Sequence, residues 1–195
     1  MYYHGVVNGL VDKKVLDILK KREISSASRL GYTKRIGFNE NDFISICSNM
    51  GEEVYGTGVN NAFNKYIKNN FCFVISDSIK AEKPVYVPNA SKMGVLELFN
   101  LRQNNPDKRF SDIIDEYQVK DYISFENIVA IGIPYNLKIE DGYIILSKFC
   151  SLTADEFLEL INKVESVASD LGILVVDSSS KEFATMFDEE KKVKN

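Results

Sequence analysis

The sequence predicts a protein of the α+β class with one domain. Short runs that alternate apolar and polar residues, or that are rich in β-branched residues, predict strands, as in FISIC at 43–47 and ILVVD at 173–177. Helices are expected at the start, in the middle and near the end of an otherwise strand-rich chain, an order typical of α+β proteins. A length of 195 residues is enough for one well-buried core and short for two.

The N-terminal elements are a strand, a helix and a loop. Residues 1–8 predict a strand that ends at an Asn-Gly pair, and a helix is expected from about Asp12 to Arg22. The basic patch in KKVLDILKKR, at 13–22, is interpreted as the solvated face of this helix beside a buried apolar stripe. The polar residues 23–42 predict a long loop, and loops of this length in compact domains often bind ligands.

The middle of the chain contains shorter elements. GTGVNN at 56–61 resembles a turn, because it lacks the Lys-Ser/Thr ending of a nucleotide-triphosphate loop. A short helix at 62–70 and an apolar strand at 71–79 follow. PVYVPNA at 84–90, with prolines at 84 and 88, predicts an edge strand or an extended segment. Residues 101–112 are expected to be a polar loop.

The C-terminal part contains the clearest helix of the sequence. GYIILSKF at 142–149 predicts a strand, and residues 151–172 predict a helix. Thr153 and Glu156 have the spacing of a capping box, in which each side chain bonds the backbone of the other residue. Gly172 stands where a helix stop is expected.

The domain is expected to close with the strand at 173–177, which we interpret as buried. The residues that follow are mostly polar. The sequence therefore assigns residues 1–180 to a single domain and residues 181–195 to a polar C-terminal tail.

Composition excludes few classes of function. With 45% hydrophobic and 27% charged residues, the chain has the composition of a soluble globular protein. A net charge of −4 provides no global attraction to nucleic acid. No signal peptide and no apolar run of roughly 20 residues are recognisable, so no membrane partner is expected. The chain is expected to be cytoplasmic where it is made, or to be an effector that is exported without a classical signal peptide.

The cysteines indicate neither disulfides nor metal. Cys47, Cys72 and Cys150 are odd in number, far apart and without the paired spacing of a zinc site. Reduced and partly buried thiols are therefore expected, with no metal ion.

The most informative segment for function is DEYQVKDYISFENIVAIGIP at 115–134. Glu116 opens a strand-like run, Val119 follows on that strand, and Ile123 and Ser124 begin a turn that leads into a second, apolar strand. This arrangement places one carboxylate at the start of a strand.

With YYHG at 2–5 and DFISIC at 42–47, this segment resembles the ADP-ribosyltransferase superfamily. The poly(ADP-ribose) polymerases have a similar Glu-Tyr-apolar-Val run, and DNA-modifying toxins of the superfamily place their Glu at a similar distance from the turn. The resemblance covers roughly residues 2–177. It implies a split, strongly twisted β-sheet core with surrounding helices, in which NAD binds between the two halves of the sheet.

The implied activity is mono-ADP-ribosyl transfer with NAD as substrate. Breaking the bond between nicotinamide and ribose gives the ribose carbon oxocarbenium character, and a carboxylate stabilises such charge, as in glycoside hydrolysis. The resemblance assigns this catalytic role to Glu116. One Glu suits a single transfer, and the acceptor is open between a protein side chain, a nucleic-acid base or end, and a small molecule.

The resemblance also assigns residues to NAD. His4 bonds a ribose hydroxyl and the backbone of Gly5 binds the nicotinamide carboxamide. Ser45 stands at the second motif, where it positions Glu116 or the ribose; a buried strand serine bonded to the backbone is an alternative. The chain lacks the tyrosine of the His branch there, and Tyr32, Phe43 or Tyr55 could replace its stacking contact. Arg29 is the candidate for the diphosphate, because a guanidinium matches phosphate geometry.

The acceptor is expected to meet Gln118, Lys108 and Arg109. The two basic residues lie in the loop that enters the strand of Glu116, and they suit a phosphate-bearing or acidic partner, although a solvated loop is equally open. A second alignment of the segment matches it to the Glu-x-Glu motif of arginine-directed toxins, with Gln118 in the catalytic position.

Three other functions stay open at this point. Water replaces the acceptor in an NAD glycohydrolase, and a catalytically degenerate relative binds NAD or ADP-ribose without turnover. A non-enzymatic protein-interaction module, with exposed tyrosines as its interface, belongs to a different class.

Overall fold

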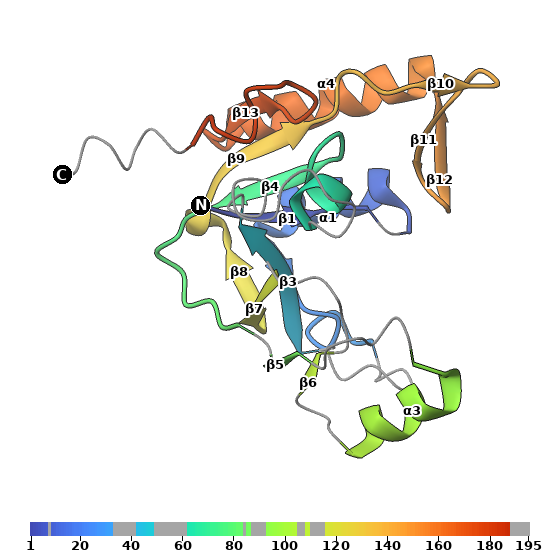
Figure 1. Cartoon of the computed structure of the whole chain (residues 1–195). Coiled ribbons are helices and arrows are strands. Elements are labelled where there is room, and N and C mark those ends of the chain that lie inside the picture. Colours follow the sequence, from blue (N-terminus) through green and yellow to red (C-terminus); the bar gives the residue numbers. More distant parts are fainter. Residues whose placement is uncertain are drawn as a thin grey trace.

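The computed structural model describes residues 1–7, 9–32, 42–48, 62–83, 85–86, 93–104, 108–109 and 116–187. Within them, a mixed sheet forms the centre of the molecule (Figure 1). Its strands in chain order are β1 (Tyr2–Gly5), β3 (Phe43–Ser48), β4 (Cys72–Ile75), β7 (Glu116–Lys120), β9 (Ile128–Ile133) and β13 (Leu174–Asp177). In space the order is β13-β9-β4-β1-β3-β7, with β9 and β13 parallel and the other neighbours antiparallel. The predicted α+β class is confirmed.

Smaller sheets and several helices surround this sheet. The paired strands are β2 (Glu23–Ser25) with β8 (Tyr122–Ser124), β5 (Val85–Tyr86) with β6 (Lys108–Arg109), and β10 (Ile139–Glu140) with β11 (Tyr143–Ser147) and β12 (Cys150–Thr153). The helices are α1 (Val11–Lys21), α3 (Val95–Asn104) and α4 (Ala154–Asp170), with the π-helical turn η1 (Phe63–Ile67) and the 3-10 turn η3 (Phe125–Asn127).

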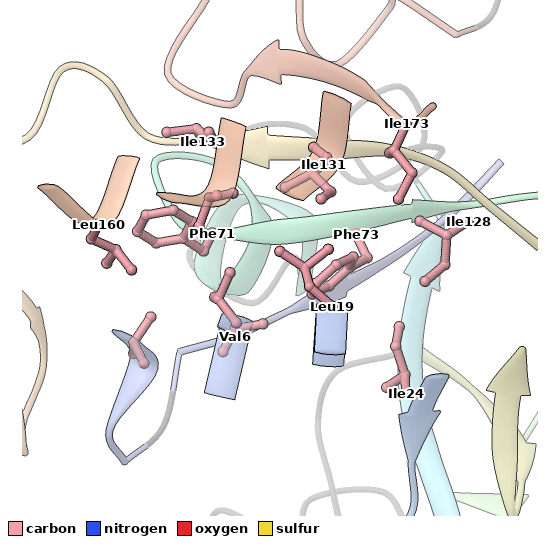
Figure 2. Close-up of a cluster of buried hydrophobic side chains, with 14 of the residues drawn as sticks. Val6, Leu19, Ile24, Phe71, Phe73, Ile128, Ile131, Ile133, Leu160 and Ile173 are labelled. Atoms are coloured by element: carbon pink, nitrogen blue, oxygen red, sulfur yellow. The ribbon is translucent and has the colours of Figure 1, made fainter. Parts of the chain in front are cut away.

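Helices α1 and α4 pack on one face of the sheet. The buried residues of α1 recur every four positions, and those of α4 follow the spacing of three and four residues that is typical of one helix face, so each helix has one apolar stripe. Figure 2 shows Leu19 of α1 and Leu160 of α4 around Phe71, Phe73 and Ile131. Among the described residues, this cluster is the larger of two hydrophobic cores.

The second core covers the opposite face and is built on aromatic rings. Tyr3 of β1 meets Phe63 of η1 edge to face, with 4.9 Å between ring centroids. Phe183 lies 5.9 Å from both rings, and Phe187 is also buried. The expectation of a polar tail from residue 181 is therefore corrected, because the chain up to Phe187 contributes to this core.

The sheet divides into two halves between β1 and β3. Strand β1 pairs with β4 over four residue pairs and β3 pairs with β7 over five, whereas the pairing of β1 with β3 comprises Tyr2 with Ser48 and Tyr3 with Cys47. Figure 1 shows β3 and β7 turning steeply away from β1, β4 and β9. The central sheet is therefore continuous at one end of β1 and split at the other.

Many of the predicted elements are present. The first strand, the helix after it and the strand at 43–47 are found, and the predicted helix at 151–172 forms α4. Thr153 and Glu156 form the predicted capping box. Gly172 ends the helix with a φ of 69°, a backbone conformation that favours glycine.

Other predictions need correction. The loop predicted at 23–42 contains strand β2, which pairs with β8, and the polar loop predicted at 101–112 contains the end of α3 and strand β6. Ile123 lies in β8 rather than in a turn, because the chain already turns at Asp121, whose φ is 65°. The closing strand β13 is an edge strand with Leu174 exposed. The turn predicted at 56–61 lies outside the described residues.

The three cysteines are free and buried, as expected. Among the described residues, the structure has no group of histidine, cysteine and carboxylate side chains that could hold a metal ion. None of the helices it describes combines the length and the apolar character needed to span a bilayer.

Truncation of Phe183 tests whether the C-terminal segment belongs to the core. Phe183→Ala is expected to lower the free energy of unfolding by about 3 kcal/mol, since it removes a buried ring and leaves a cavity. Met186→Ala is the matched control, because Met186 is 42% exposed in the same segment. Chemical denaturation measures both, and equal small losses would contradict the packing described for Phe183.

Candidate functional site

His4 bridges the two halves of the sheet at the point where they separate. Its Nδ1 atom lies 2.9 Å from the carbonyl oxygen of Ser45 on β3. A carbonyl oxygen can only accept a hydrogen bond, so Nδ1 carries the proton and donates. The imidazole thus takes the place of a backbone hydrogen bond between β1 and β3, at a point beyond the last residue pair of these two strands.

The environment of His4 favours the neutral ring. Burial lowers the pKa of His4, and repulsion by the Lys14 ammonium lowers it further, while the bond to the Ser45 carbonyl acts in the opposite direction. With Nδ1 protonated, the neutral ring has a bare Nε2, which is a hydrogen-bond acceptor. A hydroxyl group is a suitable donor to it.

The peptide groups of Gly5 face the same gap. The Val6 amide donates to the Phe71 carbonyl at 2.8 Å, in register with the pairing of β1 and β4. Because hydrogen-bonding direction alternates along an antiparallel strand, His4 also directs its peptide groups toward β4. Those of Tyr3 and Gly5 point toward β3, and Gly5 lies past the last residue pair that β1 forms with β3.

Gly5 also has a packing role. A Cβ atom at this position would lie 2.1 Å from the carbonyl oxygen of Tyr66 in η1, so any side chain would displace backbone. The residue is required to be glycine for the close approach of η1 to β1. This requirement exists whether or not the peptide groups bind a ligand.

Glu116 is the first residue of β7 and is buried, with 6% of its surface exposed. It pairs with Cys47, which pairs in turn with Tyr3, so these three residues stand in one row across the sheet. Two strand spacings separate the backbones of β7 and β1, or about 10 Å. The catalytic candidate therefore stands across β3 from the first strand, in the row of the last residue pair between β1 and β3.

The register places His4 and Glu116 on opposite faces. His4 pairs with Phe73, which belongs to the core under α1, whereas Glu116 shares the face of Tyr3. The two side chains therefore do not meet on one face of the sheet. The imidazole nevertheless reaches the edge of β3, because it turns into the gap between the strands.

Ser45 and Gln118 are neighbours. They are Cα partners on β3 and β7, and each is partly buried. The Gln118 backbone also exchanges hydrogen bonds of 2.9 and 3.0 Å with Glu82, which covers the outer edge of β7. Gln118 is thus two residues further along the strand than Glu116, and on the same face.

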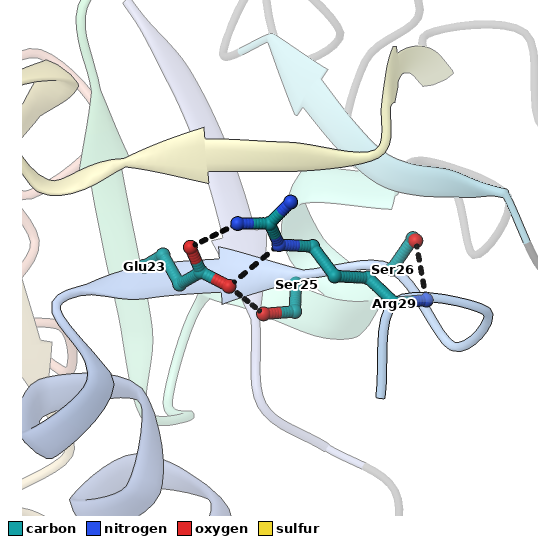
Figure 3. A network of polar contacts seen from close by, with 4 residues as sticks. All are labelled: Glu23, Ser25, Ser26 and Arg29. Carbon is teal, nitrogen blue, oxygen red and sulfur yellow. Dashed lines mark hydrogen bonds and ion pairs between the residues drawn. The ribbon is translucent and has the colours of Figure 1, made fainter. Parts of the chain in front are cut away.

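Arg29 is engaged elsewhere in the structure (Figure 3). Its guanidinium forms a two-point ion pair with Glu23, with nitrogen–oxygen distances of 2.8 and 2.9 Å. The guanidinium also stacks 4.3 Å from the centre of the Tyr122 ring. Hydrogen bonds from Arg29, and then from Ser25, lower the pKa of Glu23 to about 2. These contacts join β2 to β8 and leave the predicted diphosphate role without support from the observed geometry.

The other predicted contacts are dispersed or not described. Tyr32 is 65% exposed at the end of a turn. Lys108 and Arg109 form β6, whose backbone pairs with β5, and the structure does not describe their side chains. Tyr55 lies outside the described residues.

Sequence reasoning missed Lys14. We interpreted its basic segment as a solvated helix face, and Lys14 is indeed exposed. Its ammonium, however, is close enough to His4 to affect the pKa of the imidazole. The signal that could have found it is its position in the first turns of the helix directly after the His-Gly strand.

Comparisons with known proteins do not assign a family. No protein-family model matches the chain. No curated protein and no solved structure shows significant similarity to it.

The partly buried imidazole predicts a loss of stability in mild acid. The folded protein holds the pKa of His4 below its ordinary value of 6.5, so the unfolded state binds the proton more tightly. Stability should therefore fall as the pH drops below that value, by at most about 1.4 kcal/mol per pH unit.

The single histidine makes this loss assignable. His4→Asn cannot titrate in this range, and its free energy of unfolding should depend less on pH between 7 and 5. Denaturation at several pH values measures both proteins. Identical pH profiles would show that His4 titrates normally in the folded state.

Substitution of Gly5 should destabilise the protein before any effect on binding can be measured. Gly5→Ala is expected to cost about 1–3 kcal/mol of unfolding free energy, as overpacked positions do. Gly94→Ala is the control, since a Cβ there meets no atom within 4 Å. A Gly5→Ala protein as stable as the wild type would contradict the close approach of η1.

Proposed function

We propose that this protein is a mono-ADP-ribosyltransferase that uses NAD and belongs to the ADP-ribosyltransferase superfamily. The observation that carries the proposal is the split of the sheet beside the first strand. His4 and Gly5 stand at this split on β1, and Glu116 opens the strand next to β3. The three residues are those that the sequence resemblance selects; His4 and Gly5 border the gap between β1 and β3, and Glu116 lies on the next strand, across β3.

The chemistry of β1 suits the ribose and nicotinamide of NAD. The bare Nε2 of His4 accepts a hydrogen bond from a ribose hydroxyl. The Gly5 peptide offers a donor and an acceptor toward β3, and these match the oxygen and the amino group of a carboxamide. A neutral histidine suits this role because it binds without adding a positive charge next to the cationic nicotinamide ring.

Glu116 supplies the charge that the reaction needs. The bond between the ribose carbon and the nicotinamide nitrogen breaks, its electron pair stays with nicotinamide, and positive charge develops on the ribose. A carboxylate stabilises this charge, and burial strengthens the effect because water screens it less. An acceptor nucleophile then attacks the ribose carbon and gives up its proton.

The architecture also supports the proposal. The resemblance implies a split and twisted sheet with helices around it, and the described part of the chain has a sheet that divides between β1 and β3. We assign the acceptor to the side of β7, where Gln118 lies, and the acceptor is a protein or a nucleic acid. We prefer Glu116 to Gln118 in the catalytic position of the motif, because Glu116 is the residue that is buried at the start of the strand.

Radiolabelled NAD tests the proposal. The wild-type protein, incubated with labelled NAD and a cell extract as the source of acceptor, should release nicotinamide and label a macromolecule. Glu116→Gln should reduce nicotinamide release by at least about a hundredfold while retaining much of the affinity for NAD, because the charge acts on the transition state. Glu140→Gln, at an exposed carboxylate on β10, is the matched control and should leave the rate unchanged.

The outcomes separate the rival functions. Nicotinamide release without a labelled macromolecule indicates an NAD glycohydrolase. Binding of NAD without release indicates a degenerate relative. If NAD neither binds nor reacts, the proposal is wrong and an interaction module becomes the better interpretation.

A further inference from the structure

The π-helical turn η1 lies directly on Gly5. The carbonyl oxygen of Tyr66 would clash with a Cβ atom at this position, and the Cδ1 atom of Ile67 lies 3.3 Å from where that Cβ atom would be. The backbones of η1 and β1 are therefore in contact. Because a protein interior is close-packed, a shift of η1 changes the position of the peptide groups that Gly5 directs toward β3.

Residues 178–187, which we call the C-terminal segment, hold η1 at its start. The ring of Phe183 stacks on that of Phe63, the first residue of η1, with 5.9 Å between the centroids and 24° between the ring planes. Tyr3 of β1 meets both rings edge to face. Phe183 and Phe63 are buried, so removal of the Phe183 ring leaves a cavity beside η1 and β1.

The C-terminal segment also holds η1 at its end. Ser178 is fully buried, and its hydroxyl donates to the carbonyl oxygen of Asn70 at 2.7 Å. The carbonyl oxygen of Ser178 accepts a hydrogen bond from the Asn69 amide at 3.1 Å. The Asn70 amide in turn donates to the carbonyl oxygen of Ile67, the last residue of η1, at 3.1 Å. A chain of hydrogen bonds thus joins Ser178 to η1.

The sheet supports the C-terminal segment from the other side. A Cβ atom on Gly132 of β9 would lie 3.1 Å from the Cβ atom of Ser178 and 3.4 Å from the Cζ atom of Phe183. The Ser178 amide donates to the carbonyl oxygen of Ile133 at 3.0 Å. Both residues that hold η1 are therefore packed against the backbone of β9 or bonded to it.

We propose that the C-terminal segment is a positioning element of the nicotinamide site. Phe183 and Ser178 hold η1 against β1, and η1 fixes the Gly5 peptide groups in the orientation that a carboxamide needs. This inference rests on the proposed function, in which the Gly5 peptide binds the carboxamide of NAD. It adds two positioning residues from the opposite end of the chain, and they act on the nicotinamide part of the ligand.

Calorimetric titrations with NAD and with ADP-ribose test the inference, because ADP-ribose lacks the nicotinamide that Gly5 binds. All variants are made in the Glu116→Gln protein, in which NAD should stay intact. Phe183→Ala should weaken NAD binding about tenfold, as the loss of one or two hydrogen bonds does, and should change ADP-ribose binding by less than about twofold. A general loss of structure would weaken both ligands alike.

Further variants separate positioning from stability. Phe183→Leu keeps a buried apolar side chain and should recover most of the affinity for NAD. Ser178→Ala removes the hydroxyl at the other end of η1 and should weaken NAD more than ADP-ribose. Ile173→Ala is the matched control, because it removes a buried side chain from the other hydrophobic core, and it should bind both ligands like the parent protein. Thermal unfolding gives a common temperature at which every variant is folded.

The possible failures have different meanings. The parent protein may bind NAD while Phe183→Ala binds it equally well, or loses NAD and ADP-ribose to the same extent. Either result overturns the role of the C-terminal segment and leaves the proposed function standing, as does an equal selective loss in Ile173→Ala. If the parent protein binds neither NAD nor ADP-ribose, the proposed function itself fails and this inference fails with it.

Discussion

The hydrogen bond between the His4 imidazole and the Ser45 carbonyl is the interaction on which the candidate site depends. It stands where the ladder between β1 and β3 ends, so it fixes how the two halves of the sheet separate. It also fixes the tautomer of the ring and leaves Nε2 as an acceptor. The geometry of the gap and the chemistry offered to a ligand thus have the same origin.

The sequence predicted the elements with strong local signals. The capping box of α4 is a local feature, since Thr153 and Glu156 interact within one helical turn, and the strand at 43–47 was recognisable from its own residues. Strand β2 was missed because its three residues are polar at two positions and are stabilised by pairing with β8, which lies about a hundred residues away in the sequence. The burial of Phe183 was missed for the same reason, since its partners Tyr3 and Phe63 come from the other end of the chain.

The candidate site was predictable in part. Motif order alone selected His4, Gly5 and Glu116; the structure has His4 and Gly5 beside the gap between β1 and β3, and Glu116 across β3 from that gap. The sequence could not show that Glu116 and His4 belong to opposite faces of the sheet, because register depends on pairing between distant strands. The sequence also could not show that Arg29 forms an ion pair with Glu23, because that contact is a property of the folded chain.

The most direct test of the account is the nitrogen-15 spectrum of the single imidazole during a titration with NAD. In the Glu116→Gln protein NAD should stay intact, and the two ring nitrogens of His4 can be followed separately. The account predicts that the Nε2 resonance shifts as a ribose hydroxyl donates to it, while Nδ1 remains protonated and bonded to Ser45. An Nε2 resonance that does not change at saturating NAD would contradict the assignment of the gap between β1 and β3 as the NAD site.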